Sequence, residues 1–84
     1  MKKKHNDTLA AIFHTPTLAN VKWSDIESLF IALGAQVSEG RGSRVRILLN
    51  ERIAVFHRPH PRKETDKGAL VSVRRFLESA GVKP

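Results

Sequence analysis

Cysteine and tyrosine are absent from this 84-residue sequence, and it has one tryptophan. Without cysteine the chain can form neither disulfides nor a cysteine-based metal site, which agrees with a reducing cytoplasm. No apolar run approaches the roughly 20 residues that a membrane-spanning helix needs. The basic start, residues 1–4, is followed by polar residues and only a short apolar run, residues 9–13, so we expect no secretion signal. We therefore expect one cytoplasmic domain that does not contact a membrane.

Acidic residues are also few: eight Asp and Glu stand against fifteen Lys and Arg, and the formal net charge is +7. Such an excess favours a polyanionic partner, either a nucleic acid or an acidic protein surface. The excess is concentrated in the middle of the chain, where one acid, Glu51, is accompanied by seven basic residues: Arg41, Arg44, Arg46, Arg52, Arg58, Arg62 and Lys63.

Two helices are predicted, one on each side of this basic stretch. The first follows a capping-box pattern, in which Ser24 is the N-cap and Glu27 reaches back to it, and Gly34 is expected to end it. The second is expected over residues 67–80, where apolar residues recur at helical spacing and Gly81 follows. Each helix thus has one apolar face to bury.

The first twenty residues carry weaker signals. Residues 1–6 are polar, charged and terminal, so we expect them to be disordered. A short helix is expected over residues 9–13, packed on the rest of the protein because so short a helix is marginal alone. The sequence therefore predicts an N-terminal extension, residues 1–20, and a folded domain, residues 21–84.

Three short strands are predicted between the two helices. Residues 35–39 alternate apolar and polar, and residues 44–49 and 52–57 are rich in β-formers. Only Asn50-Glu51 separates the last two runs, which indicates a hairpin with a two-residue loop. The expected fold is α+β, with the order α-β-β-β-α, a three-stranded antiparallel sheet and a short additional N-terminal helix.

The hairpin register decides which side chains share a face. A two-residue loop pairs Val45 with Phe56 on an apolar face that should meet the helices. The opposite face then carries Arg46 and, side by side, Arg44 and His57. A one-residue slip would bury arginine, so the pattern resists slippage.

Enzyme motifs are scarce, and the carboxylates are too scattered to predict a metal or cofactor site. The remaining candidates for acid–base chemistry are His57 and His60. An imidazole can move a proton when the 2′-hydroxyl of RNA attacks the neighbouring phosphate, and Arg44 can stabilise the extra charge of the transition state. For His60, which stands between Pro59 and Pro61, a hydrogen bond to the loop backbone is an equally simple interpretation.

From Trp23 to Val82 the chain resembles the HicA family of small mRNA interferase toxins, which are encoded beside a HicB antitoxin. The resemblance is carried by the order of short motifs: Gly42-Ser43, the hairpin, Pro59-His60-Pro61, Lys67-Gly68 and Ser79-Ala80-Gly81-Val82. It implies a fold like that of the double-stranded RNA-binding domain. It also implies a toxin that binds and cleaves mRNA to arrest translation, without a metal, until an antitoxin covers its basic face.

The chain departs from the family at one position. Members typically carry the catalytic histidine directly after the Gly-Ser turn, where this chain has Arg44, so that role cannot be transferred. Either His57, with His60, performs the proton transfer, or the domain binds RNA without cleaving it, or its basic face serves only an acidic protein partner. The residues predicted to contact RNA phosphates are Arg41, Ser43, Arg44, Arg46, Arg58, Arg62 and Lys63.

Overall fold

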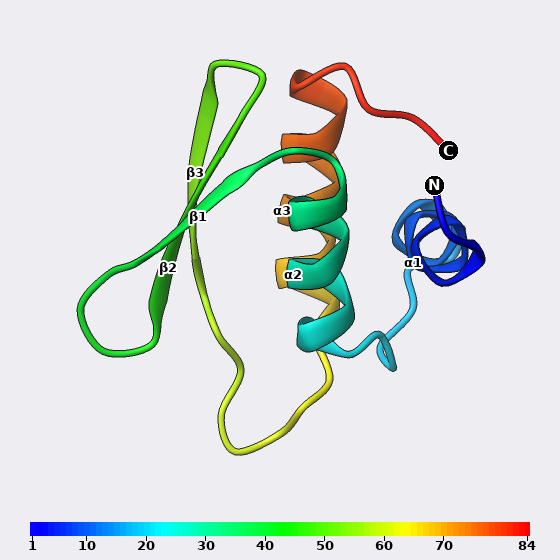
Figure 1. Cartoon of the computed structure of the whole chain (residues 1–84). Coiled ribbons are helices and arrows are strands. Elements are labelled where there is room, and N and C mark those ends of the chain that lie inside the picture. Colours follow the sequence, from blue (N-terminus) through cyan, green and yellow to red (C-terminus); the bar gives the residue numbers. More distant parts are fainter.

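The computed structural model describes residues 1–84 and contains three helices and one three-stranded antiparallel sheet (Figure 1). In chain order the elements are α1 (Lys3–Phe13), α2 (Trp23–Ala32), β1 (Gln36–Glu39), β2 (Arg44–Leu49), β3 (Arg52–His57) and α3 (Lys67–Ser79). From α2 onward the order is α-β-β-β-α, which confirms the predicted α+β fold. None of the helices is long and apolar enough to cross a membrane.

The elements form three layers (Figure 1). The sheet has the order β1-β2-β3, and α2 and α3 lie together against one of its faces. The helix α1 lies on the far side of α2 and α3 and contacts both. The other face of the sheet has no element over it, so its side chains are available to a partner.

The strand pairing of the hairpin is the predicted one, with Val45 opposite Phe56 and Arg44 opposite His57. Phe56 is buried, and its ring lies 5.7–5.9 Å from the rings of Trp23, Phe30 and Phe76. Aromatic pairs at such distances add about 0.5–1.5 kcal/mol each beyond the area that they bury. This cluster fixes the end of β3 against both α2 and α3.

The predicted capping box at the start of α2 is wrong. The N-cap is Lys22, whose side chain makes no capping bond, and Ser24 is already inside the helix. Glu27 does not reach back to Ser24; its carboxylate accepts hydrogen bonds from the indole of Trp23 and the guanidinium of Arg58. A hydrogen bond between two charged groups is roughly twice as strong as a neutral one, which explains why Arg58 replaces the local partner.

Both central helices end at the predicted glycines. Gly34 has a φ of +92°, and the amide of Ala35 behind it donates to the carbonyl oxygen of Phe30 at 2.9 Å. The amide of Val82 makes the same bond to Leu77 at 2.9 Å at the end of α3. These six-residue closures are Schellman motifs, which need a left-handed residue where glycine stands.

The N-terminal helix is longer than predicted. It begins at Lys3 instead of residue 9, so residues 3–6, which were expected to be disordered, are helical. Arg74 of α3 closes its other end, because its Nε donates to the carbonyl oxygen of Ile12 at 2.8 Å and its Nη2 to that of His14 at 3.3 Å. Ile12 itself is fully buried. These contacts to α3 are far apart in the sequence, so local patterns could not reveal them.

The hairpin loop has the backbone that its two-residue length demands. Asn50 and Glu51 both have positive φ, 49° and 67°, as a type I′ loop requires. The side-chain amide of Asn50 also donates to the carbonyl oxygen of Ala80 at 2.8 Å. The loop is thereby attached to the end of α3.

Replacing Glu51 with glycine should stabilise the protein. Glycine adopts a φ of 67° without the steric cost that glutamate bears, so we expect Glu51→Gly to raise the free energy of unfolding by roughly 0.5–1 kcal/mol. Chemical denaturation measures this change. Glu51→Gln removes the charge but keeps the backbone demand, and should leave stability unchanged. An equal gain in both variants would assign the effect to charge instead of backbone conformation.

Candidate nucleic-acid interface

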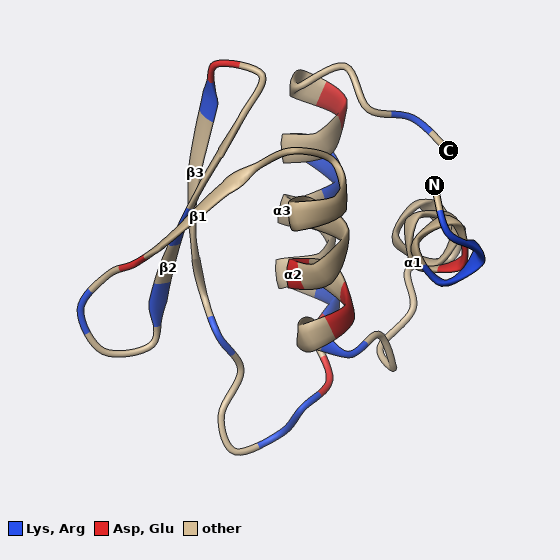
Figure 2. Ribbon diagram, viewed as in Figure 1, with Lys and Arg blue, Asp and Glu red and all other residues tan.

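The uncovered face of the sheet, called the outer face below, carries both basic and apolar side chains. Arg44 and Arg46 of β2 are exposed on it, and His57 of β3 is exposed opposite Arg44. On β3, Val55 lies opposite Arg46 and Ile53 opposite Leu48, and these two side chains are 55% and 54% exposed. Figure 2 shows Lys and Arg along β2 and in the loop after β3. The Cβ atoms of directly opposite residues lie about 4.5–5.5 Å apart, so one phosphate can reach both Arg44 and His57.

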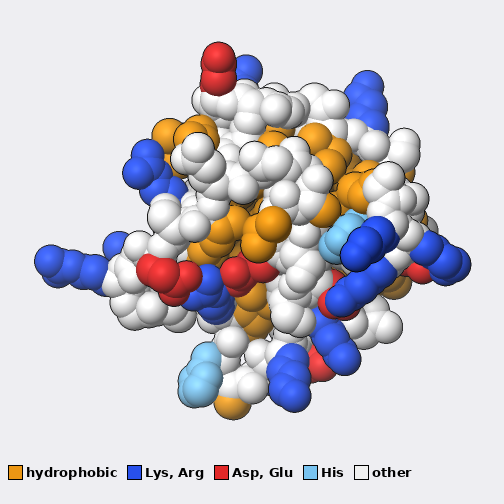
Figure 3. Space-filling model, viewed as in Figure 1, with side chains coloured by type: hydrophobic (Ala, Val, Ile, Leu, Met, Phe, Trp, Pro, Cys, Tyr) orange, Lys and Arg blue, Asp and Glu red, His pale blue; other side chains and the backbone are white.

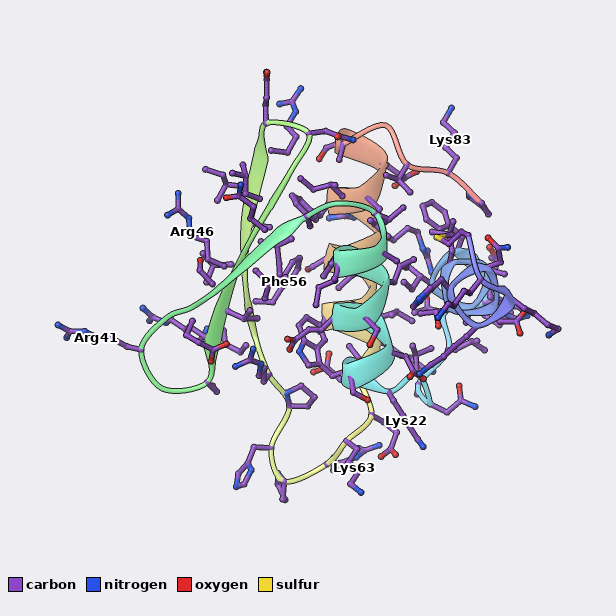
Figure 4. The ribbon with its side chains drawn as sticks, viewed as in Figure 1. Lys22, Arg41, Arg46, Phe56, Lys63 and Lys83 are labelled. Carbon is purple, nitrogen blue, oxygen red and sulfur yellow. The ribbon has the colours of Figure 1, made fainter.

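The turn between β1 and β2 borders the outer face and carries two more of the predicted contacts, Arg41 and Ser43. Both are exposed, and Arg41 points away from the body of the protein (Figure 4). The turn is close-packed: a Cβ on Gly40 would lie 3.0 Å from that of Arg44. The carbonyl oxygen of Ser43 accepts the backbone amide of Arg58 at 2.9 Å, so the end of β3 is fixed to this turn.

His57 also lines a hollow of about 450 Å³ between β3 and the beginning of α3. The carboxylate of Asp66 there accepts the amide of Ala69 at 2.8 Å, and the hydroxyl of Ser72 donates to the carbonyl of Gly68 at 3.3 Å. These polar groups are therefore already engaged within the helix. The volume is in the range of about 300–1,000 Å³ typical of small-ligand sites, so there is room for a nucleotide beside His57.

Sequence reasoning missed this hollow, because it exists only once α3 has packed beside β3. Among the residues near this hollow there was one weak signal in the sequence: the Lys67-Gly68 pair is one of the motifs that resemble the family. Gly68 leaves the first turn of α3 without a side chain, although a Cβ there would lie 3.4 Å from the carboxylate oxygen of Asp66, which is ordinary contact. The packing of two elements thus adds Asp66, Gly68 and Ser72 to the site.

Arg58, a predicted phosphate contact, is held by two carboxylates. Its Nε and Nη2 donate to Glu27 at 2.7 and 3.0 Å, and its Nη1 and Nη2 donate to Glu39 at 2.5 and 2.7 Å. Hydrogen bonds with Glu39 and Glu27 raise the pKa of Arg58, and the bond from Arg58 lowers the pKa of Glu39. This arrangement ties α2, β1 and the end of β3 together, and it favours a structural role for Arg58.

The second histidine lies apart from the first. His60 is exposed in the loop between β3 and α3, where it lines a smaller hollow of about 220 Å³. Only Asp66 borders both this hollow and that of His57. No group of three or more His, Cys, Asp or Glu side chains converges in the structure. The fold thus brings His57 to Arg44 but does not bring His57 and His60 into one hollow.

Arg62 and Lys63, the last predicted contacts, are exposed further along the same loop. They lie near Lys22, where the loop passes the start of α2 (Figure 4). Figure 3 shows basic side chains at this lower edge of the molecule. The predicted basic residues therefore form two groups, one around the outer face and one at the start of α2.

Comparison with known proteins identifies the family. The family model described as the HicA toxin of bacterial toxin-antitoxin matches residues 23–82, more than two thirds of the chain. The chain belongs to the HicA toxin family. No curated protein and no solved structure matches it. Membership makes the protein a toxin of a toxin–antitoxin system and implies an antitoxin partner.

The HicA match covers the part of the structure that carries the outer face. The matched residues include α2, the whole sheet and α3, and therefore every predicted site residue. The helix α1 lies outside the match and packs on the side of the helices that faces away from the sheet. In this HicA protein α1 thus adds core contacts and leaves the outer face open.

Proposed function

We propose that this HicA toxin cleaves mRNA by metal-independent endoribonuclease chemistry and thereby arrests translation. The observation that carries the proposal is the pair of His57 and Arg44, side by side on an uncovered, basic face next to a hollow of nucleotide size. In this proposal Arg44 occupies the usual place of the family histidine, and His57 supplies the imidazole from the neighbouring strand.

The chemistry uses the RNA itself as the nucleophile. The 2′-hydroxyl attacks the adjacent phosphorus while His57 accepts its proton, and the charge that develops on the phosphoryl oxygens is stabilised by Arg44. The bond to the 5′-oxygen then breaks, which yields a 2′,3′-cyclic phosphate and a 5′-hydroxyl end. We assign the proton for the leaving oxygen to His60 or to water, so His60→Ala should matter less than His57→Ala. Arg41, Ser43 and Arg46 bind the neighbouring phosphates.

The same face suits the antitoxin. Ile53 and Val55 provide an exposed apolar centre, and Arg44 and Arg46 provide charge beside it. Exposed apolar patches rimmed by polar residues are typical of protein interfaces. We propose that a HicB-type antitoxin with acidic and apolar side chains covers this face and excludes RNA from it.

Cleavage of RNA in the presence of a chelator tests the proposal. We expect the purified protein to cleave an mRNA in excess EDTA, to leave cyclic-phosphate ends, and to spare the same site when its 2′-hydroxyl is replaced by hydrogen. Induced expression should arrest growth, and co-expression of the antitoxin should restore it. If the protein cleaves RNA only when a divalent cation is added, the metal-independent mechanism is wrong.

Arg44 at the usual histidine position favours a second candidate, an RNA-binding or protein-interaction module that does not cleave. Such a protein would bind RNA with an affinity that falls steeply with salt, and the RNA would remain intact on long incubation. An interaction module would bind no RNA at any salt concentration. Cleavage and RNA-binding measurements together therefore separate all three functions.

A further inference from the structure

A further hollow, called the basic hollow below, lies where the loop after β3 passes the start of α2. It has a volume of about 470 Å³, and its walls include Lys22, Arg58, Arg62 and Lys63. No acidic residue lines it. Figure 4 places Lys22 and Lys63 together at this end of the molecule. The outer face, by contrast, does not include these residues.

Three of the four charges in the basic hollow are unpaired. Arg58 is neutralised by its two carboxylates, but Lys22, Arg62 and Lys63 form no salt bridge, because the four salt bridges of the structure involve other residues or Arg58. All three side chains are exposed. The hollow therefore keeps a net positive charge that an anion can neutralise.

The backbone at the start of α2 adds hydrogen-bond donors to these charges. Ser24 lines the hollow, and its amide donates to no backbone or side-chain acceptor of the protein; its hydroxyl is also without a partner. Free amides at a helix N-terminus carry partial positive charge and point toward a bound anion. Together with Lys22, Arg62 and Lys63, Ser24 offers charge and directed donors in one place.

The basic hollow is formed before any ligand arrives. The amide of Trp23 donates to the carbonyl oxygen of Lys63 at 3.0 Å, and Lys22 and Glu64 form an antiparallel bridge. The loop is thus fixed to the helix on one side, and the guanidinium of Arg58 fixes it to Glu27 on the other. Binding at a preformed site avoids the entropy cost of ordering the loop.

We infer that the basic hollow binds a phosphate of the same RNA strand, next to the nucleotide that is cleaved at the outer face. The inference rests on the proposed function. Pro59, which lines the hollow, lies two residues beyond His57, and two residues of extended chain span roughly 7 Å. One RNA strand can therefore contact His57 and the basic hollow together. The hollow sets the strand's path and requires substrates longer than the cleaved dinucleotide.

A charge-matched pair of triple variants tests the inference. The hollow variant is Lys22→Ala, Arg62→Ala, Lys63→Ala; the control variant, Lys2→Ala, Arg75→Ala, Lys83→Ala, removes the same charge from exposed positions outside both hollows. The probe is a fluorescent RNA with 2′-O-methyl groups, which cannot be cleaved. We expect the hollow variant to bind this RNA about tenfold more weakly than the wild type. The plot of log K against log salt concentration should become less steep by about 0.7, the value for one single-strand phosphate contact. The control should change the slope by much less.

Three outcomes are distinguishable. If the wild type binds no RNA, the proposed function fails. If the wild type binds and both triple variants weaken alike, attraction is diffuse and the basic hollow is no site. If an acidic peptide competes for the hollow better than RNA of equal charge, its ligand is a protein. If the triple variant unfolds, the single variant Arg62→Ala is compared with the wild type instead, because Arg62 lies in an exposed loop.

Discussion

Replacing His57 with alanine is expected to slow RNA cleavage by roughly 10²–10⁴-fold, the usual contribution of a general base, while RNA affinity stays close to that of the wild type. The imidazole is exposed and holds no element of the core, so its removal should leave the fold intact. In the proposed mechanism the RNA phosphates are bound by arginines, and these are unchanged in this variant. Single-turnover cleavage of a labelled RNA, together with binding of its uncleavable analogue, separates the two effects.

Variants of neighbouring and remote residues make this test specific. His14→Ala removes a histidine on the far side of the fold and should cleave at the wild-type rate. Arg44→Ala should lose both cleavage and affinity, because in the proposed mechanism Arg44 binds the phosphate both before and during cleavage. Adding Arg44→His to His57→Ala returns an imidazole to the usual family position, and partial recovery of cleavage is expected. Full cleavage by His57→Ala alone would show that another group accepts the proton.

The pair at the centre of this site was predictable from the sequence because its geometry is local. Only Asn50-Glu51 separates the two strands, and a loop of that length leaves one register that buries the apolar residues. Arg44 must then lie opposite His57, as it does. The glycines after α2 and α3 were predictable for the same reason, since a helix end is specified by its own last residues.

The remaining features depend on residues far apart in the chain. Glu27 binds Arg58, thirty-one positions away, where the sequence suggested a local cap. Arg74 reaches sixty-two positions back to Ile12 and extends the fold to include α1. The hollow beside His57 and the basic hollow both arise where a loop or strand meets the start of a helix. A linear pattern contains the residues of such sites but not their proximity, so Asp66, Ser72, Lys22 and Ser24 gave no signal of function.

Replacing Arg58 with alanine is expected to have the largest effect on stability. The change leaves Glu27, whose side chain is only 19% exposed, without its ionic partner, and it cuts the connection between α2, β1 and the end of β3. The variant loses hydrogen bonds between charged groups and leaves a partly buried charge unpaired. We therefore expect a loss of about 2 kcal/mol in the free energy of unfolding. Chemical denaturation measures this loss. Cleavage should fall as well, since Arg58 positions the residue before it, His57.

The dependence of stability on pH in acid shows whether the ionic bonds of Arg58 cause its stabilising effect. Arg58 lowers the pKa of Glu39 from its usual 4.5, so this bond stabilises the folded state fully above pH 4.5 and loses its effect as the pH falls through the lower folded value. The wild type should therefore lose stability in this acidic range, and Arg58→Ala and Glu39→Gln should lose less. Arg58→Lys keeps the charge but not the planar fork that reaches two carboxylates, so it should recover only part of the stability. If Arg58→Lys keeps the full stability of the wild type, charge alone suffices, and the two-carboxylate geometry of Arg58 is not what joins α2, β1 and the end of β3.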